Sequence, residues 1–386
     1  MNSKIVESSA PGKIFLFGGY SILEPNSRGL VTTVDNYVHV KVSGNNEKKL
    51  KINAVDFDAV HESYISIDGK ITNPSNEKLN LISKSVEVAL KYALEEGFKI
   101  EGINVESKND PAFATKINGN NIKSGLGSSA AVTVATISAV LSYYGFDVIH
   151  NKDKVHKLAQ IAHALVNKKI GSGFDIAAAV YGNIIYQRYS PSILSALNDD
   201  YNGHLLKELV DKSWDYKIDP IKISKINIAY ANFITGSTST NSMVSIVNKF
   251  KEREPARYKD IIERLDRANR NAIDAFVALN NGDTSKENIE RLRYNAELGR
   301  YITKELGILS NAEIESHESS ILIDNSKLFG SALFAKLPGS GGNDAIAAFC
   351  LSNTDKKKVI DFWSKRSELK VLDVDISNDG YFTNYL

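Results

Sequence analysis

The chain has 386 residues, enough for two domains of ordinary size rather than one. Its 47 Lys and Arg residues are balanced by 46 Asp and Glu residues, which excludes a general attraction to nucleic acid or to an anionic membrane, so any anion site must be local. The single cysteine, Cys350, excludes an intramolecular disulfide and a cysteine-rich metal site, and fits a reducing compartment.

Apolar runs in the chain are too short for targeting or for crossing a membrane. The run Ile14–Phe17 is shorter than the apolar core of a signal peptide. The run Ala130–Leu141 falls short of the roughly 20 residues that a bilayer requires. We therefore expect a cytoplasmic protein with no membrane partner and no nucleic-acid partner.

The first half of the chain predicts strands and helices in alternation. Strands are expected at 14–17, 30–42, 100–106 and 183–189, with a hairpin-type loop at 43–49. Helices are expected at 77–96, at 128–145, from an Asn151 N-cap to about 168, and after the glycine turn within 168–182.

The second half predicts a different order of elements. The turn-rich stretch 191–220 marks the expected domain boundary. Beyond it we expect strands at 226–235, 331–337, 343–351 and 369–375, and helices at 239–281 (interrupted), 285–306 and 354–368. This order suits a split βαβ, ferredoxin-like sandwich, so the chain as a whole is assigned to the α+β class.

The stretch KSGLGSSAAVT (123–133) places glycines, serines and alanines at a helix entrance. Glycine lets the backbone approach a ligand closely, and the first N–H groups of a helix have no partner within the helix. Together with the helix dipole they form an anion site. The alternative is a tight turn whose small residues allow close helix packing. These residues alone leave the two readings equally weighted.

Two further stretches carry possible phosphate chemistry. SAPGKIFLFGGYSILE (9–24) places Lys13 at the start of an apolar strand, where a lone lysine is more often a solvated edge residue. KLPGSGGNDAIAAF (336–349) is a second glycine-rich loop, which could equally be a plain hairpin connection.

In this order and at these positions, the three stretches together resemble the motifs of the GHMP kinase superfamily (galactokinase, homoserine kinase, mevalonate kinase and phosphomevalonate kinase). The resemblance covers most of the chain. It implies an N-terminal domain like ribosomal protein S5 domain 2 over residues 1–200 and a ferredoxin-like C-terminal domain over 201–386. It also implies that ATP lies on the glycine–serine loop between the two domains.

Finer features resemble the phosphomevalonate kinases within that superfamily. They are GGYSILE (18–24), KSGLGSSAA (123–131), KIGSGFDIAAAVYGNIIYQRY (169–189) and GGND (341–344). The resemblance implies transfer of the ATP γ-phosphoryl group to 5-phosphomevalonate, a small-molecule substrate. A mevalonate kinase, which phosphorylates an alcohol, and a catalytically silent nucleotide-binding sensor remain as alternatives. A monomer and a homodimer are both compatible with the sequence.

By this resemblance, Lys13 and Asp175 are the catalytic residues. Lys13 is expected to bridge the acceptor and the γ-phosphate, and Asp175 to orient Lys13 and tune its pKa. Without the motif, Asp175 reads as the N-cap of a helix from Ile176.

The resemblance also assigns binding residues. For the nucleotide they are Lys123, Gly125, Leu126, Gly127, Ser128, Ser129 and Ala130, with Ser129 as the Mg²⁺ ligand. For the substrate they are Ser237, Ser239, Thr240, Gly339, Ser340, Gly341 and Gly342, although plain helix capping explains the hydroxyls of 237–240 nearly as well. The acid that mevalonate kinases supply to Mg²⁺ is missing from QIAHALVN (160–167), so water, phosphates or Asp175 could share the metal with Ser129.

Overall fold

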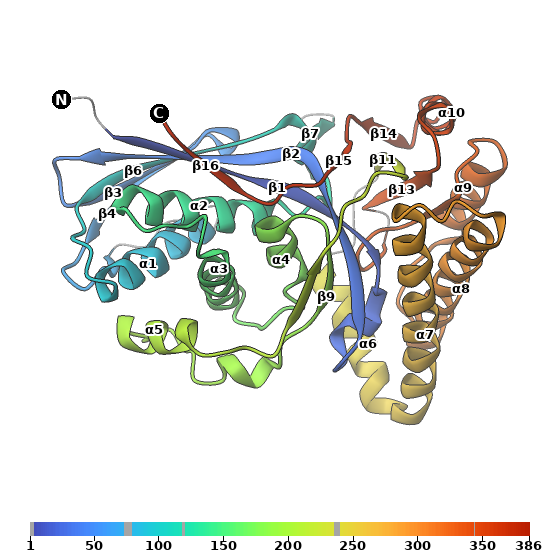
Figure 1. Cartoon of the computed structure of the whole chain (residues 1–386), viewed down its shortest axis with the longest axis horizontal. Coiled ribbons are helices and arrows are strands. Elements are labelled where there is room, and N and C mark those ends of the chain that lie inside the picture. The colour runs from blue at the N-terminus through green and yellow to red at the C-terminus, as the bar shows by residue number, and fades with distance from the viewer. Residues whose placement is uncertain (1–3, 73–78, 118–119, 235–239, 343) are drawn as a thin grey trace.

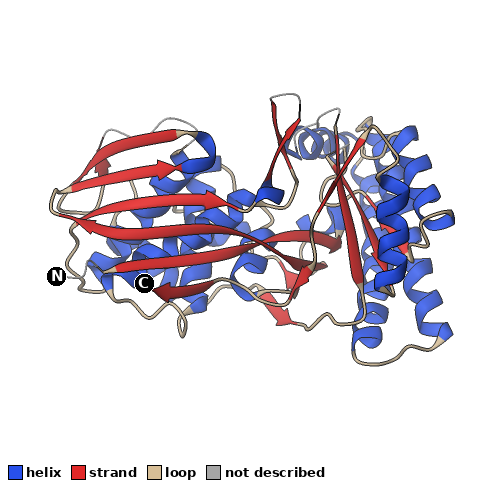
Figure 2. Ribbon diagram, turned by 90° about the horizontal axis from the view of Figure 1, so that it is seen from above, coloured by secondary structure: helices blue, strands red, loops and turns tan. Residues whose placement is uncertain are grey.

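The computed structural model describes residues 4–72, 79–117, 120–234, 240–342 and 344–386, with the backbone alone at 114–117, 120–123, 240 and 241. Two sheets, each with its own helices, lie side by side (Figure 1). Seen from above, the strands of the larger sheet run across the view with helices behind them (Figure 2). The α+β class predicted from the sequence is confirmed.

The larger sheet has ten strands in the described residues, and β2 is its central member. Its main path runs β10-β9-β2-β6-β3-β4-β5, while β1 and β15 pair with β2, and β16 pairs with β1. The strands are β1 (Ile5–Phe17), β2 (Arg28–Asn45), β3 (Lys49–Ala54), β4 (Ala59–Ile65), β5 (Ile71–Thr72), β6 (Gly102–Asn109), β9 (Ile184–Gln187), β10 (Lys217–Pro220), β15 (Ile376–Ser377) and β16 (Phe382–Tyr385). A separate hairpin joins β7 (Ala114–Ile117) and β8 (Asn120–Lys123).

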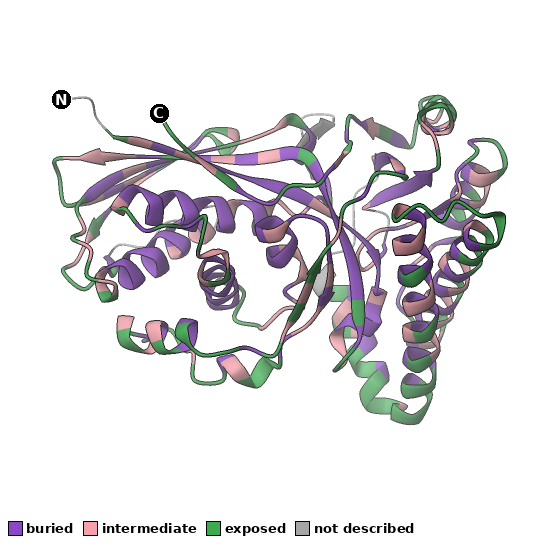
Figure 3. Ribbon diagram, viewed as in Figure 1, coloured by how far each residue is buried: buried purple, intermediate pink, exposed green. Residues whose placement is uncertain are grey.

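Helices cover one face of this sheet: α1 (Asn80–Glu95), α2 (Ser128–Tyr144), α3 (Lys152–Asn167), α4 (Phe174–Tyr181) and α5 (Gly203–Asp211). Helix α2 is buried along nearly its whole length from Ala130 onward, as Figure 3 shows. A helix that is apolar all round needs neighbours on every side, and α2 packs against β1, β2, α1, α3 and α4. Its predicted bounds are confirmed, and Gly145 ends it in the left-handed conformation.

The smaller sheet has the order β12-β13-β11-β14, and its paired strands are antiparallel. Its strands are β11 (Asn227–Phe233), β12 (Phe334–Lys336), β13 (Ala345–Cys350) and β14 (Leu369–Leu372). Its helices are α6 (Thr240–Arg253), α7 (Pro255–Asn280), α8 (Lys286–Ser310), α9 (His317–Leu328) and α10 (Asn353–Trp363). This topology confirms the predicted ferredoxin-like sandwich, and the break between α6 and α7 confirms the expected interruption.

Some expectations were wrong or incomplete. The loop after β2 is no hairpin, because β6 lies between β2 and β3 and pairs with both. Turn-forming residues indicate where a chain reverses, but not which later strand enters beside it. The sequence analysis also missed the strands β3, β4, β5, β7, β8, β10, β15 and β16, and the helices α5 and α9. Asn151 does occupy the N-cap position of α3, but its side chain donates to the Asp147 carbonyl instead of capping.

Hydrogen bonding does not follow the expected division at residue 200. Strand β10 pairs with β9, and the C-terminal strands β15 and β16 return to the larger sheet. Helix α5 packs on α1 and α3. As a statement about folding units, the division into 1–200 and 201–386 stays a prediction. The C-terminal strands tie the two parts of the chain together through main-chain hydrogen bonds.

Candidate active site

Lys13 lies in the middle of β1, not at the start of a strand as expected, because β1 already begins at Ile5. The pairing of β1 with β2 shifts register between Pro11 and Lys13. A bulge of this kind bends a strand and re-aims a side chain, and such bulges are common beside active sites. The bulge therefore presents Lys13 to the space between the two sheets.

The glycine–serine loop lies directly against Lys13. The Lys13 amide donates to the Leu126 carbonyl at 2.8 Å, and the Lys13 ammonium donates to the Gly125 carbonyl at 3.0 Å. Gly127 has a φ of 82°, and a Cβ at this position would lie 2.8 Å from Cε of Lys13. Glycine is thus required at 127 both by backbone conformation and by the close approach of the lysine stem.

Asp175 is placed by a short helix with a glycine entrance. Gly173 is the N-cap of α4, with a φ of 81°, so the N-cap reading of Asp175 is wrong. Asp175 lies in the first turn, and its Oδ1 accepts from the Ile176 amide at 3.0 Å. Phe174, the preceding residue, stacks on Phe15 of β1 with ring centroids 4.1 Å apart. This stack joins the entrance of α4 to the strand that carries Lys13.

A buried side chain of α3 holds the N-terminus of α4 through a hydrogen bond. Gln160 of α3 donates from Nε2 to the Gly173 carbonyl at 2.8 Å. The same nitrogen lies 3.0 Å from Nε2 of His156, whose pKa burial lowers to about 3, so this imidazole is neutral and accepts the second amide hydrogen. Gln160 lies in the segment where mevalonate kinases supply an acid. Here it is a structural support for the Asp175 turn.

Two opposite effects act on the pKa of Lys13. Burial lowers the pKa of Lys13 below its ordinary value, and the carboxylates of Asp175 and Asp344 raise it in part. The sequence analysis gave Asp344 no role beyond its place in GGND (341–344). The structure adds its charge to the site.

The third motif forms the opposite wall. Gly339, Gly341 and Gly342 all have positive φ, at 70°, 79° and 74°. Tyr20 of the 3-10 turn η1 (Gly19–Leu23) donates its hydroxyl to the Ser340 carbonyl at 2.9 Å. The Gly342 amide donates to the Ile314 carbonyl, so in this conformation it is engaged within the protein. Ligand contact by Gly339, Ser340 and Gly341 stays a prediction.

One cavity of about 230 Å³ connects these parts. It is lined by Lys13, Phe15, Gly19, Tyr20, Ile22, Leu23, Gly125, Ser172, Phe174, Asp175, Tyr230, Val244, Pro338, Gly339, Ser340, Asp344 and Ala345. All three sequence motifs and the turn before α4 thus meet in one place. A cavity with several convergent polar groups is the ordinary setting of a ligand site.

The N-terminus of α2 opens beside this cavity. Ser129 is exposed and Ser128 is half-buried, whereas Ala130 is buried and its amide donates to the Gly127 carbonyl. The packing interpretation is confirmed for the alanines, whereas the anion-site interpretation of the serines stays a prediction. The alanines allow close packing, and the serines are left open to a ligand. Within the described residues, neither serine lines the cavity itself.

Four expected site residues lie wholly or partly outside the described residues. Ser237 and Ser239 lie outside the described residues, and the side chains of Thr240 and Lys123 do as well. Helix α6 begins at Thr240, and its Val244 lines the cavity. The entrance of α6 is thus at the site, but the roles of these hydroxyls and of Lys123 stay predictions.

The sequence analysis gave no role to two tyrosines at the site. Tyr20 anchors the third motif, and Tyr230 of β11 donates to the Ser124 carbonyl at 2.7 Å, just before the glycine–serine loop. Tyr20 could have been singled out because it lies within the quoted motif GGYSILE. No local pattern marks Tyr230, which reaches the loop only through the packing of the two sheets.

No cluster of three or more His, Cys, Asp or Glu side chains suited to a metal ion occurs in the part of the chain that the structure describes. Mg²⁺ does not require such a cage, since it is commonly held by one or two carboxylates together with substrate phosphates and water. Asp175, Asp344 and the hydroxyl of Ser129 supply the hard oxygen donors that suit this ion. The donor set therefore fits Mg²⁺ bound together with phosphates.

Among the described helices, none has the length and apolar character needed to cross a membrane.

Comparison with known proteins agrees with this geometry. Residues 80–183 match the family model described as GHMP kinases N terminal domain. The chain is 31% identical to the phosphomevalonate kinase of Saccharolobus solfataricus, over 97% of this chain and 98% of that one. It is 29% identical to the phosphomevalonate kinase of Candida albicans, over 89% of each chain.

A solved structure shares the fold. Streptococcus pneumoniae phosphomevalonate kinase in complex with phosphomevalonate and AMPPNP superposes with a TM-score of 0.76 and 18% identity, over 96% of this chain and 99% of that one. The fold, the meeting of the three motifs and the full-length similarity lead to one conclusion: the chain belongs to the GHMP kinases, and within them to the phosphomevalonate kinase family.

Proposed function

We propose that this protein transfers the γ-phosphoryl group of ATP to the phosphate of (R)-5-phosphomevalonate, giving ADP and (R)-5-diphosphomevalonate. The single observation that carries the proposal is the meeting of Lys13, Asp175 and both glycine-rich loops around one cavity. The full-length similarity to phosphomevalonate kinases supports the choice of acceptor.

The acceptor phosphate needs little activation. Its second pKa is near ~6, so at neutral pH it is mostly a dianion whose oxygen attacks the γ-phosphorus while the bond to the bridging β-γ oxygen breaks and ADP leaves. The barrier lies in bringing two polyanions together. The site therefore has to supply positive charge and N–H donors.

Lys13 supplies the central cation. Its hydrogen bond to Gly125 holds the ammonium at the glycine–serine loop, and the Phe174 ring face lies 5.9 Å from Nζ. From there the ammonium is placed to neutralise charge shared by the γ-phosphoryl group and the acceptor. Asp175 and Asp344 favour its protonated form by opposing the effect of burial on its pKa.

The main chain supplies the other donors. The amides of Ser128 and Ser129 begin α2, ahead of the first bonds within the helix, which come from Ala130 and Ala131. These amides, together with the hydroxyls, suit the phosphates of the nucleotide. Gly339, Ser340 and Gly341 face them from the third motif and suit the transferring phosphoryl group. Leu126 contributes its carbonyl to the anchoring of Lys13.

Ser129 and Asp175 are the residues we assign to Mg²⁺, with Asp344 as a further carboxylate at the cavity. When bound with ATP, Mg²⁺ neutralises phosphate charge. Asp175 then has two tasks, to orient Lys13 and to contribute oxygen to the metal.

We further assign the protein to the cytoplasm. A monomer and a homodimer both stay predictions.

A coupled ADP-release assay tests the function by comparing 5-phosphomevalonate, mevalonate and diphosphomevalonate as substrates. We expect turnover with 5-phosphomevalonate. Turnover with mevalonate alone would replace the acceptor with an alcohol, and ATP binding without any turnover would indicate a silent sensor. Lys13→Ala and Asp175→Ala should each reduce kcat by roughly 10²–10⁴-fold. Lys41→Ala, at an exposed lysine of β2, is the control and should leave kcat unchanged.

A further inference from the structure

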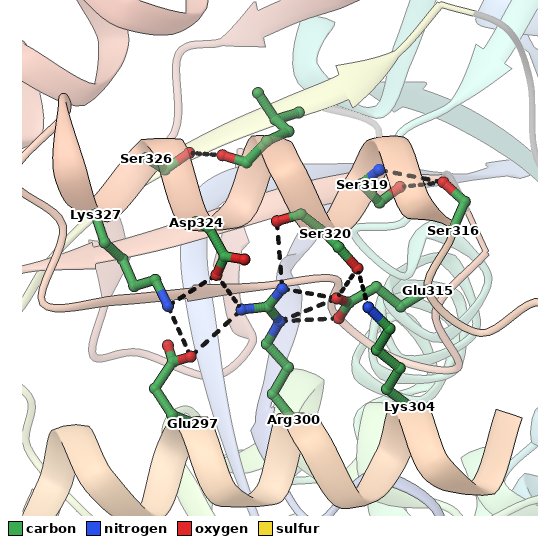
Figure 4. Close-up of polar contacts among 11 residues, drawn as sticks. Glu297, Arg300, Lys304, Glu315, Ser316, Ser319, Ser320, Asp324, Ser326 and Lys327 are labelled. Atoms are coloured by element: carbon green, nitrogen blue, oxygen red, sulfur yellow. Dashed lines mark hydrogen bonds and ion pairs between the residues drawn. The ribbon is translucent and has the colours of Figure 1, made fainter. Parts of the chain in front are cut away.

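A cluster of charged side chains, with Arg300 and Glu315 buried and the others partly exposed, lies between α8 and α9, outside the cavity described above (Figure 4). At its centre is Arg300 of α8, whose side chain is 5% exposed. Its guanidinium contacts three carboxylates: Nε and Nη2 donate to Glu315 at 3.0 and 2.7 Å, and Nη1 donates to Asp324 at 2.7 Å and to Glu297 at 3.3 Å.

The rest of the cluster balances these charges. Lys327 donates to Glu297 at 2.7 Å. Lys304 donates to Ser320 at 2.6 Å, and the hydroxyl of Ser320 donates in turn to Glu315 at 2.6 Å. A buried ion pair often adds little net stability because desolvation offsets the attraction. What it does determine is the geometry of the groups it joins.

Glu315 is the least exposed carboxylate of the cluster, and the residue before it contacts the third motif. Its side chain is 6% exposed and accepts from two of the three guanidinium nitrogens. The residue before it, Ile314, is buried, and its carbonyl accepts from the Gly342 amide at 2.8 Å. A Cβ at Gly341 would lie 2.3 Å from that same carbonyl oxygen. The Ile314 peptide and the glycine loop are therefore in direct contact, with no room for either to shift alone.

A second, smaller cavity borders both the charge cluster and the glycine loop. It measures about 40 Å³ and is lined by Arg300, Glu315, Ile314, Gly339 and Gly341, among other residues. It shares Gly19 and Gly339 with the larger cavity. Arg300 itself does not line the larger cavity among the described residues, so it has no direct contact with the expected path of the phosphoryl group.

We propose that Arg300 is a positioning residue for phosphoryl transfer: through Glu315 and the Ile314 carbonyl it sets the place of the glycine loop Pro338–Gly342. The proposal rests on the proposed function, because it assigns that loop to the transferring phosphoryl group. If the guanidinium no longer holds Glu315, the Ile314 peptide shifts and the loop amides move with it. Misplacement of donors by about 1 Å is enough to slow an aligned reaction by about 10²-fold.

Kinetics of the purified full chain with ATP and 5-phosphomevalonate test this. We expect Arg300→Met to reduce kcat at least about 10-fold while the Kd of ADP, measured by calorimetry, stays within about twofold. Arg300→Lys keeps the charge but not the fork of donors, so its kcat should lie between those of Arg300→Met and the wild type. Glu315→Gln tests the same link with a side chain of equal size, and it decides the matter if Arg300→Met does not fold.

Arg264→Met is the matched control. Arg264 of α7 also donates two hydrogen bonds to a glutamate of α8, with Nη1 3.1 Å and Nη2 2.5 Å from Glu305, but it lines neither cavity among the described residues. Its loss should lower stability in urea without changing kcat. If folded Arg300→Met, Arg300→Lys and Glu315→Gln all keep wild-type kcat, or if kcat falls equally in Arg264→Met, the positioning role is overturned.

Gly341→Ala separates failure of this inference from failure of the proposed function. Because its Cβ has no room beside Ile314, this substitution displaces the loop directly and should also reduce kcat. If the two residues act through one loop, the double variant Arg300→Met/Gly341→Ala should lose no more than about the larger single loss. Losses that multiply would reject the relay. Wild-type kcat in Gly341→Ala would instead reject the assigned role of the loop, and with it part of the proposed function.

Discussion

The ammonium of Lys13 donates a hydrogen bond of 3.0 Å to the carbonyl of Gly125, joining two motifs that are 112 residues apart in the chain. The backbone of Lys13 is held to the same loop through Leu126. Two hydrogen bonds thus hold Lys13 and the glycine–serine loop together.

The lowered pKa of Lys13 predicts an alkaline limit on activity. Burial lowers its pKa from the ordinary 10.5, and the reaction requires the protonated form, so kcat/KM should fall as pH rises through this lowered pKa. A profile of kcat/KM from about pH 6 to about pH 10.5 measures it. In Lys13→Arg, whose guanidinium does not titrate in this range, residual activity should lack the alkaline fall. An unchanged fall in Lys13→Arg would assign it to another group.

Gly127→Ala should damage the site more than it damages the fold. The new methyl group would lie 2.8 Å from Cε of Lys13, so the lysine stem has to move. We expect kcat to fall at least about 10-fold, as for a misplaced catalytic group. Gly97→Ala is the control, because Gly97 has a similar φ of 86° with nothing within 4 Å of its Cβ. Both variants should lose about 1–2 kcal/mol of stability from positive φ, and equal loss of kcat in both would contradict the prediction.

Tyr20→Phe removes the hydroxyl that holds the third motif to the first. Its 2.9 Å bond to the Ser340 carbonyl is a neutral hydrogen bond at a buried side chain, worth about 1 kcal/mol. We expect kcat to fall about fivefold with a smaller change in the KM of ATP. Tyr258→Phe, which loses a 2.9 Å bond to Glu24 away from the cavity, should leave kcat unchanged. Stopped-flow or steady-state rates on both variants distinguish loop anchoring from a general loss of packing.

Lys336 predicts a change of stability with pH. Its ammonium donates to the Leu16 carbonyl, and burial lowers its pKa from 10.5 to about 8 in the folded protein, with Glu315 raising it in part. Between these two values the unfolded chain binds more protons than the folded chain, so stability rises with pH. The wild type should gain up to about 1.4 kcal/mol per pH unit relative to Lys336→Met between about pH 8 and about pH 10. Urea unfolding of both proteins at each pH measures it, and parallel curves would refute it.

The local elements of this fold could largely be predicted from sequence. Helix α2 was expected at 128–145 and runs from Ser128 to Tyr144, because Gly127 and Gly145 mark both ends. The ferredoxin-like order followed from the sequence of strand and helix patterns. The strand β3 and its neighbours were missed, since their partner β6 lies some 50 residues later in the chain and pairing depends on that distant strand.

For the site, the resemblance of short motifs to the GHMP kinases assigned roles to Lys13, Asp175, the glycine–serine loop and the third motif, and these roles stay predictions. Such motifs can be recognised in sequence because glycine-rich turns leave a signature in a short window. Only the tertiary structure placed Tyr20 on Ser340, Gln160 under Gly173 and Arg300 behind the glycine loop. Each of these contacts starts from one element and ends on another segment through a hydrogen bond or an ion pair, across 13, 15 or 320 residues of the chain. A contact of this kind depends on how sheets and helices pack, and no periodicity or spacing in the sequence encodes it.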